Sequence, residues 1–352
     1  MRAPGRGDRC AVFVCSASAR SGAGHLVRCA ALAETLRGAG WRTLLLTRAE
    51  TQDFIGMTGD VFDQMQLTTV DTEGIAWAAE IASGVAQAVV VVDDYDLPAE
   101  FESTLARNMP VVAFGDLPGR VHAARLLVDP TPGRRAVDYV AFVPADCSVL
   151  TGPRHAILRL PFHKARAVRG ADDPRRGAGL LVNLGGSDPL GLIPKTVSTL
   201  RAVLPERSVT VVCGRRAADA LDLPSDRRVR VLTNVNGASM ARLMDEAALA
   251  VGAAGSSSWE RCVCALPSVT TSIADNQDDI ARGLKRAGAA SVLPLERFVA
   301  DLAEARVTLL GSGTAYSAMS AAAVGLCDGQ GASRVAAAIE RLATPAKTRV
   351  EA

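Results

Sequence analysis

The chain has 352 residues, of which 49% are hydrophobic and 22% are charged, and its net charge is +2 at pH 7. This length and composition predict a globular protein with two domains of ordinary size. Lysine and arginine are scattered and aromatic residues make up only 4%, so nucleic acid is not expected as a partner. No uncharged apolar run reaches about 18 residues, so we expect no membrane insertion.

The N-terminal residues and the cysteines limit the location and the cofactors. The first ten residues are basic and glycine-rich, and the apolar segment 11–16 is too short for the core of a signal peptide. We therefore expect a cytoplasmic protein. Cys262 and Cys264 have the wrong spacing for a zinc site, and Asp93 and Asp94 have no apparent third ligand. The prediction is no metal and no cofactor, with most of the eight cysteines buried.

Strands alternate with helices along the first half of the chain. The apolar segment 11–16 is followed by a glycine loop that ends at His25, by a predicted helix over 26–37 and by a second strand over 41–47. The segment 87–93, with four consecutive valines, is the clearest buried strand. Further strands are predicted over 110–114 and 125–128.

The alternation stops in the middle of the chain and then starts again. Residues 154–177 are charged and contain proline and glycine, so we place a linker there. The second half again begins with a strand, a glycine loop and a helix, and three alanine-rich helices close the chain. The pattern predicts an α/β protein in which two Rossmann-like domains face each other across a cleft. The predicted parts are 1–170, 171–330 and a C-terminal helix and tail over 331–352.

A serine-rich segment follows the predicted strand over 248–252. Ser256, Ser257 and Ser258 precede a short helix, and such a turn leaves backbone N–H groups that can hold a phosphate. Glu260, one turn into the helix, can accept hydrogen bonds from a ribose diol. The segment therefore indicates a nucleoside diphosphate site, although glycine and serine after a strand also form ordinary turns.

His25 is the candidate general base. It closes a loop with two glycines at the start of a predicted helix, where the helix dipole disfavours the charged imidazolium. The alternative is a histidine that only caps or packs the helix. His122 lies in a predicted helical segment, and His155 and His163 lie in the predicted linker, so we expect structural or surface roles for these three.

Two further loops carry polar groups at strand ends. The loop 185–188 offers a second set of N–H donors, and in it Asp188 is also suited to cap a helix that begins at Pro189. Asn276 follows the predicted strand over 268–272 and is placed to bind a sugar hydroxyl or to position a water molecule. Equally, Asp275 in the same loop is suited to cap a helix.

Taken in order, six motifs resemble one known family. They are GAGHLVRC at 22–29, VDDY at 92–95, GPRHAILR at 152–159, GGSDP at 185–189, GAAGSSSWERC at 252–262 and ADNQ at 274–277. Together they resemble the UDP-sugar hydrolase of pseudaminic acid biosynthesis, which belongs to the GT-B superfamily alongside the MurG glycosyltransferase. The similarity extends in unbroken order over most of the chain.

The resemblance implies a GT-B architecture in which the C-terminal domain binds UDP. It implies that His25 works at C1 of the sugar with Asn276 beside it, that Glu260 binds the ribose, and that no metal is needed. The UDP-binding residues that it implies are Gly185, Gly186, Ser187, Gly255, Ser256, Ser257, Ser258 and Glu260. Those expected on the sugar and acceptor side are Gly22, Gly24, Arg28, Asp94, Tyr95 and Gln277.

The departures from this family lie in the N-terminal half. Val14 and Ser16 stand where the family carries Arg and Asp, and Gly115 with Asp116 replaces a pair of Asp residues. The family's Arg-Pro-Glu-Phe reads RLPF at 159–162. Because this half faces the sugar and the acceptor in the GT-B fold, we expect a UDP-sugar donor but a different sugar, a different acceptor, or both.

Two enzymatic functions remain. The first is a glycosyltransferase that moves a sugar from UDP to a small acceptor, such as a nucleobase or another secondary-metabolite core, with His25 as the base. The second is a hydrolase in which water attacks C1 and UDP is released. A nucleotide sensor without catalysis would leave His25 unexplained. We favour the transferase, because the departures lie on the acceptor side.

Overall fold

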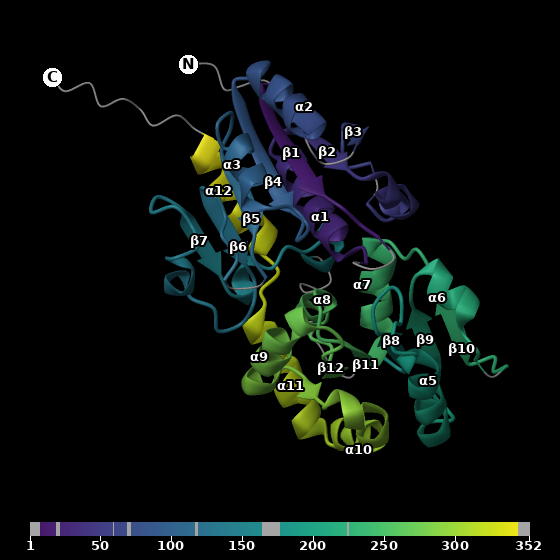
Figure 1. Cartoon of the computed structure of the whole chain (residues 1–352). Helices are drawn as coiled ribbons and strands as arrows, with labels where there is room; N and C mark the ends of the chain where they lie inside the picture. Colours follow the sequence, from purple (N-terminus) through teal and green to yellow (C-terminus); the bar gives the residue numbers. More distant parts are fainter. Residues whose placement is uncertain are drawn as a thin grey trace.

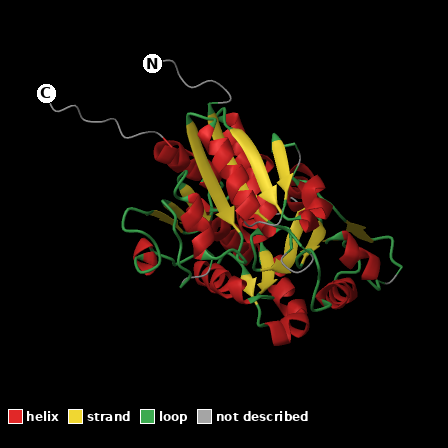
Figure 2. Cartoon of the chain, turned by 45° about the horizontal axis from the view of Figure 1, so that its top comes forward, coloured by secondary structure: helices red, strands yellow, loops and turns green. Residues whose placement is uncertain are grey.

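The computed structural model describes residues 8–18, 22–58, 60–68, 72–116, 119–163, 177–223 and 225–343. Within these residues, strands form one parallel sheet in each half of the chain (Figure 1). Helices lie on both sides of the strands (Figure 2). The predicted α/β class with two Rossmann-like domains is confirmed. The predicted boundary at residue 170 and the tail after residue 343 lie outside the described residues.

The N-terminal sheet has the strand order β3-β2-β1-β4-β5-β6-β7, and all neighbouring strands are parallel. Its strands are β1 (Arg9–Cys15), β2 (Arg42–Thr47), β3 (Gln64–Leu67), β4 (Gln87–Asp93), β5 (Val111–Phe114), β6 (Leu126–Asp129) and β7 (Ser148–Thr151). The sequence did not predict β3 and β7, which are short edge strands with partly exposed residues.

The valine run of β4 shows why this strand is apolar throughout. Val89 and Val91 pack in the core cluster that includes α1, whereas Val90 and Val92 pack in the cluster on the opposite face. Successive side chains of a strand point to opposite faces, so a strand covered by helices on both sides has no polar position.

Helices cover both faces of the N-terminal sheet. They are α1 (Gly24–Gly38), α2 (Thr72–Ser83) and α3 (Ala99–Leu105), with the short helices η1 (Ala49–Met57), η2 (Ala136–Tyr139) and η3 (Pro153–His155). The helical position predicted for His122 is wrong, since this residue lies in the loop before β6. Its Nδ1 lies 2.9 Å from Glu102 Oε1, and this buried pair ties the loop to α3.

The C-terminal sheet has the order β10-β9-β8-β11-β12-β13 and is also parallel. Its strands are β8 (Gly179–Asn183), β9 (Val209–Val212), β10 (Val229–Leu232), β11 (Ala247–Ala253), β12 (Ser268–Thr271) and β13 (Ser291–Val292). Its helices are α5 (Leu192–Val203), α6 (Arg215–Ala220), α7 (Gly237–Glu246), α8 (Ser257–Val263), η4 (Asp275–Gln277), α9 (Asp278–Ala287), η5 (Leu295–Arg297), α10 (Phe298–Gly311) and α11 (Gly313–Leu326).

The last helix, α12 (Gly331–Ala343), returns to the N-terminal sheet (Figure 1). Val335 and Ile339 are fully buried in the same core cluster as α1 and β4. Only glycine fits at Gly331, because a Cβ there would lie 2.1 Å from the carbonyl oxygen of Ala156. The end of the chain thus completes the core of the N-terminal domain.

The burial of the cysteines agrees with the expectation from sequence. Seven of the eight cysteines are buried and Cys147 is partly exposed, so the prediction that most are buried is confirmed. In the described part of the chain, no helix is both long enough and apolar enough to cross a membrane.

Candidate active site

The predicted loops lie where the strand order of each sheet reverses. This point falls between β1 and β4 in the N-terminal sheet and between β8 and β11 in the C-terminal sheet. Open parallel sheets bind ligands in the crevice at this point, beyond the carboxyl ends of the strands. The loop after β1 leads to His25, and the loop after β11 leads to Ser256, so both loops stand at the binding edges of their sheets.

These two loops approach each other across the domain interface. A Cβ at Gly24 would lie 3.9 Å from Ser256 Oγ. A hollow opens between the two domains at this place. Its walls include Gly24, Arg28 and Ala31 of α1, Ser256, Trp259 and Glu260 at α8, and the connecting residues Leu158 and Arg159. A ligand in the hollow would therefore touch both domains.

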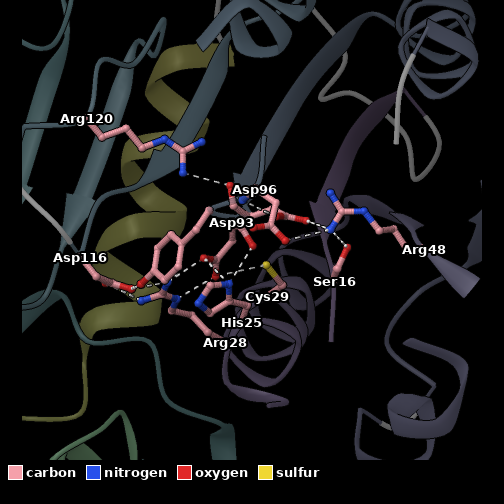
Figure 3. A network of polar contacts seen from close by, with 11 residues as sticks. Ser16, His25, Arg28, Cys29, Arg48, Asp93, Asp96, Asp116 and Arg120 are labelled. Atoms are coloured by element: carbon pink, nitrogen blue, oxygen red, sulfur yellow. Dashed lines mark hydrogen bonds and ion pairs between the residues drawn. The ribbon is translucent and has the colours of Figure 1, made fainter. Parts of the chain in front are cut away.

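His25 is oriented by the end of β4 (Figure 3). Its Nδ1 lies 3.1 Å from the backbone oxygen of Asp93, which can only accept a hydrogen bond. In the neutral ring, Nδ1 therefore carries the hydrogen and Nε2 keeps its lone pair. The ring also meets Tyr95 edge to face, with 4.5 Å between the ring centroids. The side chain of His25 is 16% exposed, so part of the ring remains accessible.

Arg28 joins Asp93 to Asp116, which lies just beyond β5. Its Nε and Nη2 donate to Asp93 at 2.8 and 2.6 Å, and its Nη1 and Nη2 donate to Asp116 at 2.8 and 2.9 Å. Burial would raise the pKa of Asp116, but the charge and hydrogen bonds of Arg28 together with the hydrogen bond from Tyr95 outweigh burial and lower it to about 2. Burial would lower the pKa of Arg28, but both carboxylates together raise it above its ordinary value. Arg28 and Asp116 are therefore both ionised at neutral pH.

Tyr95 adds a hydroxyl to the same cluster. This hydroxyl donates a hydrogen bond to Oδ2 of Asp116. Burial, and then the negative charge of Asp116, raise the pKa of the Tyr95 phenol. Tyr95 is therefore protonated at neutral pH and acts as a donor to Asp116.

Asp94 is held by two arginines instead of pointing freely into the cleft. Arg48, which follows β2, places Nη1 3.1 Å from Asp94 Oδ2 and 3.5 Å from Ser16 Oγ. Arg120 donates to the backbone oxygen of Asp94 at 3.1 Å. Figure 3 shows the two arginines reaching the end of β4 from opposite sides. The edge of the N-terminal sheet therefore carries acidic and basic side chains that are largely paired with one another.

The serine loop of the C-terminal domain is built differently. Ser256 is exposed, Ser257 is partly exposed, and Ser258 is only 1% exposed. The guanidinium of Arg261 lies beneath the loop, and its Nη2 donates to Ser258 Oγ at 2.8 Å and to the backbone oxygen of Ala253 at 2.7 Å. Burial lowers the pKa of Arg261 to about 10. The side chains of Ser258 and Ser257 thus support the loop, because Ser257 Oγ also accepts from Arg261 Nη1 at 3.3 Å, whereas Ser256 is exposed.

Glu260 forms an ion pair across the domains. Its Oε1 accepts a hydrogen bond from Arg159 Nη2 at 2.8 Å, and the residue is 8% exposed. Arg159 belongs to the connecting segment after η3 and packs against Gly237 at the start of α7. Within the described residues, Oε2 of Glu260 has no hydrogen-bond partner, so one carboxylate oxygen is left for a ligand hydroxyl.

The loop after β8 lies beside the serine loop, because β8 and β11 are neighbours. Gly185 has φ +95°, a conformation that favours glycine, and the oxygen of Gly186 accepts from Gly214 N at 2.8 Å. The predicted helix start at Pro189 is wrong, because α5 begins at Leu192. Asp188 itself has φ +44°, and its carboxylate accepts from the backbone N–H groups of the first helical turn.

Asn276 and Gln277 belong to η4, beyond β12 on the edge of the C-terminal sheet. Gln277 turns toward the serine loop, because its Nε2 lies 3.5 Å from where a Cβ of Gly255 would be. Its Oε1 accepts from Ile273 N at 3.2 Å. Gln277 therefore lies with the predicted UDP-binding residues, and not with the N-terminal side chains with which the sequence grouped it.

Solved structures share this architecture. A scan against protein-family models and a search of curated proteins gave no match. MurG of Acinetobacter baumannii is similar at 16% identity over 95% of this chain and 99% of its own, with a TM-score of 0.60. The UDP-GlcNAc 2-epimerase of Neisseria meningitidis, bound to UDP-GlcNAc, is similar at 10% identity over 94% and 100%, with a TM-score of 0.64.

The spinosyn rhamnosyltransferase SpnG, complexed with thymidine diphosphate, is similar at 18% identity over 96% of this chain and 100% of its own. Its TM-score is 0.59. Identities this low establish the fold alone. They confirm the predicted GT-B architecture, with two Rossmann-like domains that face each other.

Sequence reasoning missed the arginines that complete the site. Arg48, Arg120 and Arg159 each reach a carboxylate or a backbone oxygen distant in sequence. Arg159 ends the recognised motif at 152–159 but was given no role, and nothing in the local sequence of Arg48 or Arg120 marks them among the many arginines of the chain. Asp93 and Asp116 carried a signal, since each follows a predicted strand at the carboxyl edge of the sheet.

Proposed function

We propose that this protein is a glycosyltransferase that moves a sugar from UDP to a small acceptor. The observation that carries the proposal is the meeting of the His25 loop and the Ser256 loop at one hollow. A base with an unprotonated Nε2 then stands on one side of the cleft, and a turn with outward N–H groups stands on the other. A nucleotide-sugar bound between them would place its sugar next to the base.

In the proposed reaction, UDP lies against the C-terminal domain. The N–H groups of Ser256 and Ser257 precede the first intrahelical bond of α8 and face the diphosphate. The buried charge of Arg261 beneath them favours the same anion, so the proposal includes no metal cofactor. The free oxygen of Glu260 accepts from the ribose, while Arg159 fixes the carboxylate.

The chemical step takes place at C1 of the sugar. The acceptor's hydroxyl or N–H group attacks C1, the bond from C1 to the β-phosphate oxygen breaks, and His25 Nε2 takes the acceptor's proton. UDP leaves with the electron pair of the broken bond, and donors aimed at its phosphates lower the barrier to its departure. The hydrogen bond from Nδ1 to Asp93 stabilises the imidazolium that forms.

The N-terminal departures support a changed acceptor side. Val14 is fully buried in β1, so it does not reach the sugar. Ser16 lies at the carboxyl edge of β1, beside Arg48. A carboxylate at position 115 is absent, and a Cβ at Gly115 would already lie 3.1 Å from Leu127. Of these changes, Ser16 is the one that alters the surface facing the cleft.

The alternative is a UDP-sugar hydrolase in which His25 activates water. The ordered motifs at 22–29, 252–262 and 274–277 favour it, since they resemble such an enzyme. Among the structurally similar proteins, SpnG is a rhamnosyltransferase and the Neisseria protein a UDP-GlcNAc 2-epimerase. The GT-B fold therefore serves several reactions at a nucleotide-linked sugar, and the occupant of the acceptor space decides between them.

Incubation with a panel of UDP-sugars and thymidine diphosphate sugars tests the proposal. Release of nucleoside diphosphate is followed with water alone and with pools of small acceptors. We expect release that depends on an added acceptor. Rapid release with water alone would replace the transferase by the hydrolase, and no release from any nucleotide-sugar, together with no binding of UDP, would refute both.

A further inference from the structure

The contacts around His25 form a closed ring. His25 Nδ1 contacts the backbone oxygen of Asp93, and the carboxylate of Asp93 accepts from Arg28. Arg28 donates to Asp116, Asp116 accepts from the hydroxyl of Tyr95, and the ring of Tyr95 meets the imidazole edge to face. Figure 3 shows Arg28, Asp93 and Asp116 gathered around His25.

Arg28 has little capacity left for a substrate. It makes four hydrogen bonds to the two carboxylates, and a guanidinium has five N–H donors. Its remaining face lies over the ring of Phe114, with 4.4 Å between Cζ and the ring centroid. Arg28 lines the hollow but is 9% exposed, so it acts mainly on its protein neighbours.

We propose that Arg28, Asp116 and Tyr95 are positioning residues that hold His25 in the tautomer and orientation of a general base. Arg28 fixes residue 93, whose backbone oxygen selects the Nδ1–H tautomer. Tyr95, anchored through Asp116, fixes the plane of the imidazole. In this arrangement three side chains orient the base. The inference rests on the proposed function, in which His25 is that base.

Isotope-edited NMR tests the positioning without any substrate. Long-range proton–nitrogen spectra distinguish the two neutral tautomers, and the chain has only four histidines to assign. In the native protein we expect His25 as the Nδ1–H tautomer. In Arg28→Lys and in Tyr95→Phe we expect a mixture of tautomers, because an imidazole without a fixed partner populates both. His122, on Glu102, serves as the internal reference that does not change.

Kinetics then connects the tautomer to turnover. We expect Arg28→Lys and Tyr95→Phe to lower kcat about 10- to 100-fold, the size expected when a reacting group is misplaced, with KM for the nucleotide-sugar within about twofold. Two control variants should retain the native kcat. Arg201→Lys changes a partly exposed Arg–Asp pair on α5, and Tyr316→Phe loses a buried hydroxyl contact to Ala248.

Each outcome decides the positioning role. A single Nδ1–H tautomer in both variants, or a native kcat, would overturn it. If Arg28→Lys proves unfolded by circular dichroism, Tyr95→Phe carries the test, since it removes one oxygen and keeps the ring. If the native protein turns over no nucleotide-sugar, the proposed function fails, while the NMR experiment still shows whether the ring fixes His25.

Discussion

The two binding edges of the molecule are built in opposite ways. At the N-terminal edge, side chains of opposite charge satisfy one another, as Arg28 does with Asp93 and Asp116. At the C-terminal edge, the buried Arg261 donates to the hydroxyls of Ser257 and Ser258 from beneath a turn in which Ser256 is exposed. The first arrangement fixes one side chain, His25, whereas the second leaves donors available for a ligand.

This difference separates catalysis from binding. A general base must be held within a narrow geometry, and paired charges in a buried setting supply that rigidity. A phosphate site needs donors that are not already used, and the first turn of a helix provides them. Changes at the N-terminal edge should therefore alter turnover, and changes at the C-terminal edge should alter nucleotide affinity.

Removing the base should have the largest effect. We expect His25→Ala to lower kcat about 10²- to 10⁴-fold, the usual contribution of a positioned base, with nearly native affinity for UDP. Steady-state kinetics and calorimetric titration with UDP measure the two quantities. His155→Ala is the matched control, because His155 Nδ1 also contacts a backbone oxygen, that of Thr151. Full activity of His25→Ala would remove the base from the mechanism.

The second-largest effect is expected when a methyl group is added at Gly252, beneath the serine loop. A Cβ at Gly252 would lie 2.6 Å from Arg261 Nη1 and 2.7 Å from the backbone oxygen of Asn183. We expect Gly252→Ala to lower the free energy of unfolding by about 3 kcal/mol and to weaken UDP binding, because Arg261 and the loop above it must move. Urea unfolding and UDP titration provide the measurements.

The control for this change is Gly325→Ala. Gly325 lies in α11 with open space around it, so a methyl group there meets nothing. The free energy of unfolding of the Gly325→Ala variant should stay native or rise slightly, since alanine favours the helix. Its affinity for UDP should stay native. Native affinity in Gly252→Ala would show that Arg261 does not support the nucleotide site.

Acidic pH should remove the stabilisation that Asp116 contributes at the N-terminal edge. The pKa of Asp116 is about 2 in the folded protein, because the charge and hydrogen bonds of Arg28 and the hydrogen bond from Tyr95 together outweigh burial. In an unfolded chain it lies near 4. A lowered pKa stabilises the fold above pH 4, and this contribution of about 2 kcal/mol disappears as the pH falls from 4 to 2.

The Asp116→Asn variant isolates this effect. It lacks the titrating group, so its unfolding free energy should fall less than that of the native protein between pH 5 and pH 2.5, by up to about 2 kcal/mol. Urea unfolding at the two pH values gives the comparison. Parallel losses in both proteins would show that the pair of Arg28 and Asp116 does not couple folding to protonation.

The sequence predicted the buried strands of the fold better than the edge strands and the packing of the last helix. The pattern located the buried strands, with β4 at its observed bounds, because fully covered parallel strands are apolar at every position. It missed β3 and β7, whose edge positions leave them mixed in polarity. It also gave no sign that α12 returns to the N-terminal core, since its alanines fit either domain.

The candidate site follows the same rule. The loops of His25 and Ser256 were recognisable from glycine and serine after strands, which is local information. The ion pair of Arg159 with Glu260 depends on the packing of two domains across 101 positions of sequence, and no short pattern encodes it. The sequence therefore predicted that Glu260 binds the ribose but did not predict its ion pair with Arg159.

Glu260→Gln should have the smallest effect. It tests whether Glu260 binds the ribose or serves only in the ion pair with Arg159. Glutamine retains an oxygen acceptor but loses the charge, so we expect UDP affinity to fall by about 1 kcal/mol, or about fivefold. Arg159→Gln leaves the carboxylate in place without its cation, and it should reduce affinity less if Glu260 itself binds the ribose. Calorimetry with UDP and with 2′-deoxy-UDP separates the contributions, because only the former offers the complete diol. If Glu260→Gln weakens both nucleotides equally, the carboxylate does not contact the 2′-hydroxyl, and its role is the contact between the domains.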